Sequence, residues 1–229
     1  MRIILIPGLG YNCRIFENLD LSDFDKQCLN WIEPFPNEKL REYSQRIFNQ
    51  IENNHEKLII IGHSFGGIVA QEIASFERID QIILISSIKS RKEMPWHFKI
   101  VKSLFLHKFF TKQMSIKTVN FWGKTHGFET QNEKELFKDM VGHHTNTYLQ
   151  WALKSLSSWQ ETKIPNSTTI FHVNFLIAFA NGVIYLRKRF HITMMANFPC
   201  YQNFHHLLLE SFPSAFSNFF INRTKLRLR

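Results

Sequence analysis

The sequence predicts an α/β fold, with a doubly wound, mostly parallel sheet and a helical insertion, and three observations indicate it. Short apolar runs recur at 2–7, 57–61 and 81–87, the pattern of strands buried on both faces. Helical patterns lie between these runs, and such alternation favours parallel strands joined by right-handed crossovers. At 229 residues, the chain suffices for one domain with a sizeable core.

Residues 1–88 contain the predicted core of the sheet. "RIILIP" opens it as a buried strand, and "KQCLNWIEP" at 26–34 is a weaker strand candidate. A helix is expected over 37–54, because its apolar residues fall on one face: Leu40, Tyr43, Ile47, Phe48 and Ile51. "KLIII" at 57–61 is the next strand, a second helix is expected over 65–77, and "QIILISS" is the strand that follows.

Residues 89–160 change to amphipathic helical segments rich in Phe, Trp and Lys, which we interpret as a helical lid. Within the lid, "TQNEKELFKDM" predicts a helix that begins at Asn132, because an Asn-x-x-Glu start precedes apolar spacing. The aromatic residues of the lid are expected either to line an apolar pocket or to pack the lid onto the core: Trp96, Phe98, Phe121 and Trp122. Strand character returns in "NSTTIFHV", and residues 161–173 are assigned to the core.

Residues 174–229 form an atypical C-terminal segment. They hold nine Phe but a single acidic residue, Glu210, and they show neither helix caps nor a clear periodicity. The composition changes directly after a well-formed strand. One hypothesis is therefore that a frameshift or read-through produced this segment and that the sheet lacks its last strand and last helix. The other two reading frames of the gene beyond this strand would test the hypothesis.

The net charge of +9 comes mainly from the end of the chain, because residues 173–229 contribute +6 and the first 172 residues only +3. No nucleic-acid-reading motif accompanies the basic residues, and the apolar stretch of the tail is too short to span a bilayer. Neither nucleic acid nor a membrane is therefore expected as a partner. The scattered cysteines argue against a zinc site or a disulfide framework and favour a reducing, cytoplasmic location: Cys13, Cys28 and Cys200.

The motif "GHSFGG" at 62–67 lies where a predicted strand meets a predicted helix. It matches Gly-x-Ser-x-Gly, a tight turn that lifts a serine hydroxyl above the sheet at the N-terminus of a helix. Ser64 is therefore a candidate nucleophile, and the alternative is a Gly-rich turn that happens to contain a serine. The glycines that let neighbouring elements pass closely are Gly62, Gly66 and Gly67.

The loop "IPGLGYNCRIFENL" at 6–19 joins the first strand to a short helix. In an acyl-transfer site, backbone N–H groups must converge on the oxyanion. We expect one N–H from Phe65, directly after the serine, and the other from Leu9, with Gly8 and Gly10 shaping the loop. The alternatives are an ordinary turn or a phosphate-binding loop, although the loop lacks the Lys-Ser/Thr of a P-loop and the third glycine of a dinucleotide fingerprint.

From Met1 to about Val173 the chain resembles the α/β-hydrolase fold family, especially small lid-bearing bacterial members. The matching pieces are "IPGLG", "GHSFGG", "QIILISS", the helical insertion and "TTIFHV". The resemblance implies Ser-His-Asp hydrolysis of a small ester, thioester or amide through an acyl-enzyme, without a cofactor. It does not fix the substrate, because this fold supports several chemistries.

The chain departs from this family where the catalytic acid and base are due. The acid usually follows the strand that matches "TTIFHV", but the chain continues "HVNFLIAFANG" and has no Asp after Val173. In the family the histidine follows the acid, whereas the one later carboxylate here follows every later histidine. The weak candidates for base and acid are His191, His205, His206 and Glu210.

Other ionisable residues fit structural roles better. His63 adjoins the serine and is expected to point away from it as a structural residue or a pocket wall. His143 and His144 lie in the lid, where surface positions are expected. Asp80 precedes a strand and is expected to cap it or to face solvent, and Asp139 lies in the middle of a lid helix.

Three functions therefore stay open. The first is a serine hydrolase that acts on a small, partly apolar acyl substrate beneath the lid. The second is a catalytically inactive or truncated α/β-hydrolase-like protein that lacks the triad Asp and His. The third, a membrane-associated or nucleic-acid-binding basic protein, depends on the tail alone and would show salt-sensitive binding.

Overall fold

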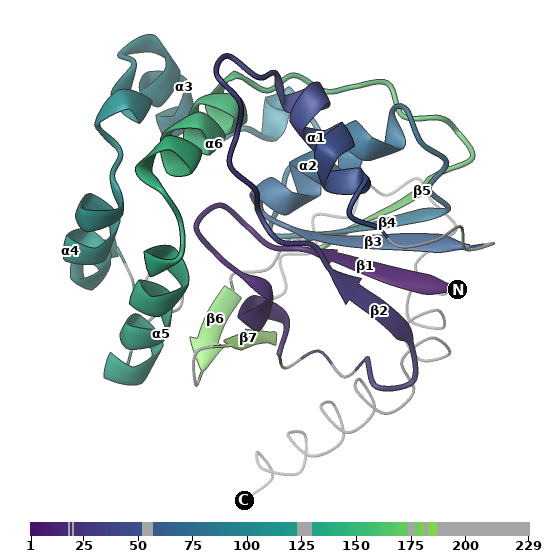
Figure 1. The fold of residues 1–229 in the computed structure, drawn as a ribbon, viewed down its shortest axis with the longest axis horizontal. Helices are drawn as coiled ribbons and strands as arrows, with labels where there is room; N and C mark the ends of the chain where they lie inside the picture. The colour runs from purple at the N-terminus through teal and green to yellow at the C-terminus, as the bar shows by residue number, and fades with distance from the viewer. Residues whose placement is uncertain are drawn as a thin grey trace, which may run out of the picture.

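The computed structural model describes residues 1–186 apart from 18, 20, 52–56, 123–129, 174–176 and 181–182, and for 122 and 171–186 it describes the backbone alone. At its centre lies a five-stranded parallel sheet in the order β2-β1-β3-β4-β5 (Figure 1). The strands are β1 (Arg2–Ile6), β2 (Asp25–Cys28), β3 (Leu58–His63), β4 (Gln81–Ile85) and β5 (Thr169–Val173). The α/β fold class is confirmed, and each predicted core strand is present.

Helices and short 3-10 turns fill the connections, as the periodicity predicts. Before β4 these are η1 (Cys13–Phe16), α1 (Leu40–Phe48) and α2 (Phe65–Ala74). The insertion after β4 is helical, and its elements are η2 (Arg91–Glu93), α3 (Trp96–Ser103), η3 (Leu106–Phe109), α4 (Lys112–Trp122), α5 (Gln131–Gly142) and α6 (Asn146–Ser158). We keep the name lid for this insertion.

Both faces of the sheet are covered, which is why its strands are apolar throughout. Alternate residues of neighbouring strands, such as Ile4 and Ile60, form one core with α1, α2 and the inner side of α6. The residues between them, such as Leu5 and Ile61, form a second core with η1 and with Phe137 and its neighbours on the lid helices. Figure 1 shows α1 and α2 together over one face of the sheet.

The strand predicted over 26–34 is shorter in the structure. Only Asp25–Cys28 pairs with β1. Cys28 lies opposite Leu5, and β1 itself ends at Ile6 before Pro7, which has no N–H to donate to a ladder. The segment after Cys28 therefore has no strand beside it to pair with. Instead, this segment crosses toward the loop after β1 and bends at Asn37, whose φ is 59°, before α1 begins.

The lid helix α5 begins earlier than predicted. Thr130 caps it: the Thr130 hydroxyl accepts a hydrogen bond from the Glu133 N–H at 3.3 Å, and the Glu133 carboxylate accepts one from the Thr130 N–H at 2.7 Å. The predicted start at Asn132 was wrong because the Thr-x-x-Glu pair two residues earlier forms both bonds of a capping box.

Cys13 and Cys28 form a disulfide, which corrects the prediction of unpaired cysteines. The two residues are 15 positions apart in the sequence, and their Cα atoms are 6.0 Å apart. Cys13 begins η1 after the β1 loop and Cys28 ends β2, the strand beside β1, so the sheet brings them together. The disulfide removes the ground on which a reducing, cytoplasmic location was inferred.

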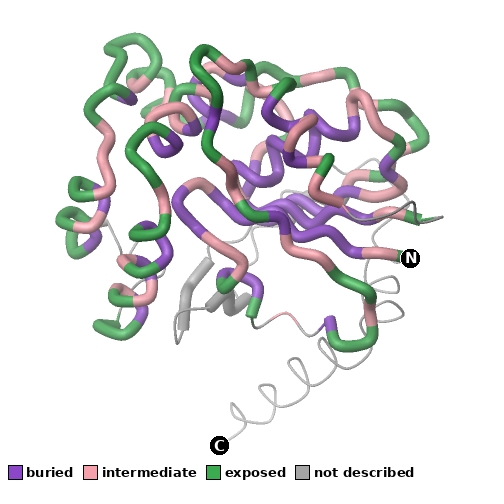
Figure 2. The backbone as a smooth tube through the Cα atoms, viewed as in Figure 1, coloured by how far each residue is buried: buried purple, intermediate pink, exposed green. Residues whose placement is uncertain are grey.

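Two predicted pocket-lining aromatic residues of the lid face outward instead. Trp96 is 70% exposed and Phe121 is 92% exposed, and Figure 2 marks many residues of α3 and α4 as exposed. Phe98 is partly buried and packs against the core, as the alternative expectation held. The side chain of Trp122 lies outside the described residues.

The described part of the C-terminal segment does not extend the main sheet. β6 (Ile177–Ala180) and β7 (Val183–Leu186) pair antiparallel as a separate ribbon, and β7 lies against η1. Predictions about residues 187–229 fall outside the described residues. No helix in the described ranges is long and apolar enough to cross a bilayer.

Candidate functional site

Ser64 lies in the tight turn between β3 and α2 that the motif predicts. Its backbone has φ 49° and ψ −116°, a conformation that L-residues rarely adopt. Three hydrogen bonds hold it there. The Ser64 N–H donates to the Ile85 carbonyl oxygen at 2.8 Å, and the Ser64 carbonyl oxygen accepts from the Gly67 N–H at 3.0 Å and from the Ser87 hydroxyl at 2.7 Å.

The glycines around Ser64 are required by close approach of the backbone. A Cβ at Gly66 would collide with the carbonyl oxygens of Ile6 and Pro7, where β1 ends. A Cβ at Gly62 would lie 2.5 Å from the Gly67 Cα, so the strand and the helix also approach each other too closely for a side chain. The first turn of α2 therefore lies directly against the chain that leads into the Gly8–Tyr11 loop.

The predicted oxyanion loop is a tight turn. The Tyr11 N–H donates to the Gly8 carbonyl oxygen at 3.1 Å, and Gly10 has φ 76°, which a glycine adopts without strain. The Trp31 indole N–H donates to the same Gly8 oxygen at 3.1 Å. Sequence reasoning missed Trp31, because it belongs to a segment predicted as a strand and its partner is 23 residues away.

His63 lies beneath this turn and is buried. A Cβ at Gly8 would lie 2.7 Å from the His63 Nδ1, and the Tyr11 ring meets the imidazole edge-on with centroids 5.3 Å apart. The Nδ1 is buried without a hydrogen-bond partner among the described residues. Burial lowers the pKa of His63 from 6.5 to about 4. Its ring is therefore neutral at pH 7 and packs as a structural residue.

The lid rests on the same loop. The Val141 Cγ2 atom is 3.0 Å from where a Cβ at Gly10 would lie, and the rings of Phe137 and Tyr11 are 5.9 Å apart. The His144 Nε2 donates to the Tyr11 carbonyl oxygen at 3.2 Å. Burial is the largest cause of a lowered pKa at His144, which the bond to Tyr11 partly opposes. His144, expected simply at the surface, is half-buried and anchors the lid to the loop.

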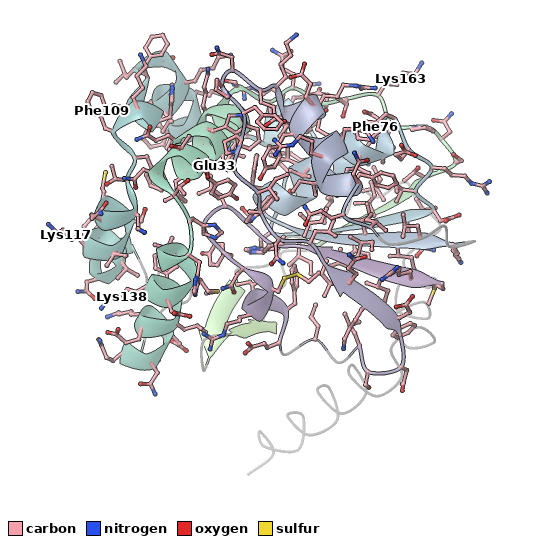
Figure 3. The ribbon with its side chains drawn as sticks, viewed as in Figure 1. Glu33, Phe76, Phe109, Lys117, Lys138 and Lys163 are labelled. Atoms are coloured by element: carbon pink, nitrogen blue, oxygen red, sulfur yellow. A yellow bond between two sulfur atoms is a disulfide. The ribbon has the colours of Figure 1, made fainter. Side chains whose placement is uncertain are left out.

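Asp139 and Glu33 make further links between the lid and the core. Arg14 Nη1 donates to the Asp139 carboxylate at 2.9 Å, and exposed His143 lies 3.6 Å from the same carboxylate. The Thr145 hydroxyl donates to the Glu33 carboxylate at 2.7 Å, at the base of α6 (Figure 3). These contacts fix the lid beside the carboxyl ends of β1 and β2.

A cavity of about 270 Å³ borders the loop. Its lining mixes aromatic rings, side-chain amides and imidazoles, and Ser64 is not part of it: Pro7, Tyr11, Asn12, Asn30, Trp31, His143 and His144. The cavity therefore adjoins the predicted oxyanion loop rather than the serine hydroxyl. Among the described residues, no group of three or more His, Cys, Asp or Glu is arranged to hold a metal ion.

The structure does not supply a base for Ser64 within its described ranges. No histidine there hydrogen-bonds the Ser64 hydroxyl. Asp80 instead accepts a hydrogen bond from the Leu58 N–H at 2.8 Å and caps β3 at the opposite edge of the sheet. Buried Glu72 accepts one from the Trp159 indole at 3.0 Å. The four candidates lie outside the described residues: His191, His205, His206 and Glu210.

Solved structures of hydrolases and related proteins share this fold, among them these three. A carboxylesterase structure from Nitrososphaera gargenis is 17% identical with a TM-score of 0.58, covering 75% of this chain and 70% of that one. MenH from S. aureus is 15% identical with a TM-score of 0.53, covering 74% of each chain. A lipase-esterase related protein from Clostridium acetobutylicum is 13% identical with a TM-score of 0.51, covering 75% and 84%.

The parallel sheet, the turn between β3 and α2 and the helical insertion define an α/β-hydrolase-fold protein. Residues 21–162 match the family described as PGAP1-like alpha/beta domain, and the chain belongs to this family. No protein of curated function matches the chain in sequence. The resemblance to α/β hydrolases inferred from the motifs is thereby confirmed.

Proposed function

We propose that the chain is a serine hydrolase that cleaves a small, partly apolar ester, thioester or amide through an acyl-enzyme on Ser64. The carrying observation is the Ser64 turn: a non-glycine residue held at φ 49° between a buried strand and a buried helix. Strained backbone of this kind persists where the surroundings enforce it, and it clusters at active sites. The esterase-like neighbours and the α/β-hydrolase family support the same reaction class.

In the proposed reaction, the Ser64 hydroxyl oxygen bonds to the acyl carbon while its proton passes to a base. The resulting oxyanion accepts hydrogen bonds from the N–H groups of Phe65 and Leu9. Collapse of this intermediate breaks the bond to the leaving group, which takes the proton from the base. Water then repeats the two steps and releases the acid. The candidates for the base and its orienting acid are His191, His205, His206 and Glu210.

The assignment of the Gly8–Tyr11 turn as the oxyanion loop is supported by its position close to the first turn of α2. The Gly66 backbone meets Ile6 and Pro7, so the first turn of α2 and the Gly8–Tyr11 turn are neighbours. Positive charge at a helix N-terminus adds to the stabilisation of an oxyanion there. The cavity beside Trp31 borders the same turn and gives room for part of a small substrate.

A second candidate is a catalytically inactive member of the same fold. Two observations favour it: the sequence has no Asp after Val173, and no histidine in the described ranges hydrogen-bonds Ser64. In this case the strained turn is inherited and performs no chemistry.

Covalent labelling separates the two candidates. The purified, folded chain is treated with a fluorophosphonate probe, beside Ser64→Ala and beside Ser103→Ala, which removes an exposed serine of α3. Labelling that disappears in Ser64→Ala alone is the expected result, and His191→Gln, His205→Gln and His206→Gln then locate the base. A chain that shows a cooperative unfolding transition but takes no label would establish the inactive candidate.

A second set of variants in the labelling experiment tests the oxyanion loop itself. Leu9 is the second residue of a turn with Gly10 at positive φ, a position where proline fits well. Leu9→Pro therefore removes the amide N–H with little change of the turn. We expect it to slow labelling about 10²- to 10³-fold, the usual effect of losing one oxyanion donor. Leu9→Ala keeps the amide and is the control, and equal rates for the two variants would exclude Leu9 as a donor.

A further inference from the structure

The outer side of the lid exposes apolar side chains to an unusual extent. In the described part of the chain, ten large apolar side chains are exposed, and eight fall within residues 96–121. We call these eight the outer lid surface: Trp96, Ile100, Leu104, Phe105, Leu106, Phe109, Met114 and Phe121. Exposed apolar side chains that gather in this way mark interaction surfaces, whereas single ones need no explanation.

The arrangement on α3 shows that this exposure is not incidental. Trp96, Ile100 and Leu104 are spaced four residues apart, so they follow one side of the helix. None of the eight residues of α3 is buried. Phe109, at the end of η3, is 71% exposed. Figure 3 shows Phe109 and Lys117 at the same outer edge of the molecule, on the opposite side from Lys163.

The charge of this surface has one sign. Residues 96–121 contain five lysines and neither Asp nor Glu: Lys99, Lys102, Lys108, Lys112 and Lys117. The lysines alternate with the apolar residues, and the Lys108 Nζ lies 5.5 Å from the centroid of the Phe105 ring. Long lysine side chains beside exposed rings can keep their charges in a polar layer while the rings enter an apolar one.

We propose that the outer lid surface docks onto the anionic face of a lipid bilayer. Aromatic rings and leucines would enter the boundary between headgroups and acyl chains, and the lysines would meet the lipid phosphates. The proposed association is peripheral, because the outer lid surface would meet the bilayer from one side. It is independent of the proposed hydrolase function.

The charge of the outer lid surface favours a lipid bilayer over a second copy of the chain as its binding partner. If two copies met through this surface, two sets of four exposed lysines would face each other without an acidic residue between 96 and 121 to pair with them, whereas Lys112 donates to the Gly142 carbonyl oxygen within the lid. An anionic lipid surface supplies the opposite charge. From the sequence alone, membrane association was considered only for the basic tail. The structure shows exposed rings and lysines on the lid instead.

Vesicle sedimentation with the full chain tests the proposal. The chain is mixed with vesicles of phosphatidylcholine alone or of phosphatidylcholine with phosphatidylglycerol. We expect partition into the anionic vesicles, with a loss of binding as ionic strength rises. Trp96→Ser with Phe109→Ser is expected to weaken binding about tenfold or more for each ring removed. Lys99→Gln with Lys102→Gln is expected to weaken it about fivefold for each lysine at low salt.

Two matched variants keep the test specific. Phe35→Ser removes a 60% exposed ring from the loop before α1, and Lys163→Gln removes an exposed lysine on the far side from Phe109 (Figure 3). Both are expected to bind vesicles as the unchanged chain does. All variants should keep the melting temperature of the unchanged chain to within a few degrees, because these side chains are exposed.

Three outcomes would overturn the proposal. The first is no partition of the unchanged chain into anionic vesicles at low salt. The second is full binding by the Trp96→Ser, Phe109→Ser variant, which would assign lipid binding to the basic tail. The third is self-association without lipid, seen by analytical ultracentrifugation and abolished in that variant, which would identify a second copy as the occupant.

Discussion

The helices α2 and α3 have similar lengths and opposite surroundings. All ten residues of α2 are buried, including the polar side chains of Gln71 and Glu72. None of the eight residues of α3 is buried, although it carries tryptophan, phenylalanine and isoleucine. The chain therefore uses apolar residues in two ways. In α2 they lock a strained serine against the sheet, and in α3 they remain exposed for contact with another surface.

The two regions also differ in how closely neighbouring backbone segments approach their glycines. Close backbone approach, in addition to the chemistry of the side chains, defines the Ser64 turn. Around Gly66 the neighbouring backbone of β1 leaves no room for a methyl group, and β1 lies between two other strands. At the end of the lid helix α5, a Cβ on Gly142 would meet nothing within 4 Å. The same substitution at these two glycines compares the two regions directly.

The largest expected effect comes from Gly66→Ala. Its methyl group would collide with two backbone carbonyl oxygens that the sheet holds in place, so we expect a loss of at least about 3 kcal/mol in the free energy of unfolding. Gly142→Ala should instead be neutral or stabilising by up to about 1 kcal/mol, because alanine is the better helix former. Urea unfolding of both variants measures the difference. Equal losses at the two positions would contradict it.

Two buried histidines extend the comparison to pH. His63 belongs to the core turn, and its pKa is lowered to about 4 by burial. His107 belongs to the lid, and its pKa is lowered by burial first and then by Lys154 and Lys108. In both cases the unfolded chain takes up the proton more readily than the folded one. Stability is therefore full above about pH 6.5, the ordinary pKa of histidine, and falls as the pH drops below it.

We expect His63 to account for a loss of up to about 3 kcal/mol between pH 6.5 and 4, from the difference between its folded and unfolded pKa values. His63→Leu should flatten the decline of stability over this range, and His107→Gln should flatten it less. Urea unfolding at a series of pH values gives the slopes. If His107→Gln had the larger effect, or if neither variant changed the slope, His63 would not be the buried neutral group that we infer.

The sequence predicts the core well because its signals there are local. The runs at 57–61 and 81–87 are apolar on both faces, which predicts buried strands. The glycines around Ser64 predict a tight turn in which the backbone of neighbouring elements packs closely. The fold class follows from the alternation of these elements. The exception is the strand predicted over 26–34, which is shorter in the structure because its partner β1 ends at Ile6.

The features that sequence patterns missed depend on contacts between distant segments. The disulfide joins Cys13 to Cys28 because β1 and β2 are neighbours, which their spacing does not reveal. Trp31 and His144 donate hydrogen bonds to the Gly8–Tyr11 turn from positions 23 and 133 residues away in the sequence. An amphipathic pattern such as that of α3 also does not reveal whether its apolar side packs on the core or stays exposed.

The smallest expected effect isolates the strain at Ser64. At φ 49° and ψ −116° a side chain costs about 1–3 kcal/mol, and a glycine would not incur this cost. We expect Ser64→Gly to be about 1 kcal/mol more stable than Ser64→Ala, after the entropy lost by glycine on folding is subtracted. Neither variant can form an acyl-enzyme, so the two differ in backbone freedom rather than in chemistry.

The lid contains a counterpart in Phe105, which also has positive φ. Its φ of 51° and ψ of 29° place it in the ordinary left-handed region, where a side chain is less strained than at Ser64. Phe105→Gly should therefore gain less relative to Phe105→Ala than Ser64→Gly gains relative to Ser64→Ala. Paired urea unfolding of the four variants measures both differences. A larger gain at Phe105 would mean that the core turn stores no particular strain, and the strongest support for Ser64 as a nucleophile would be lost.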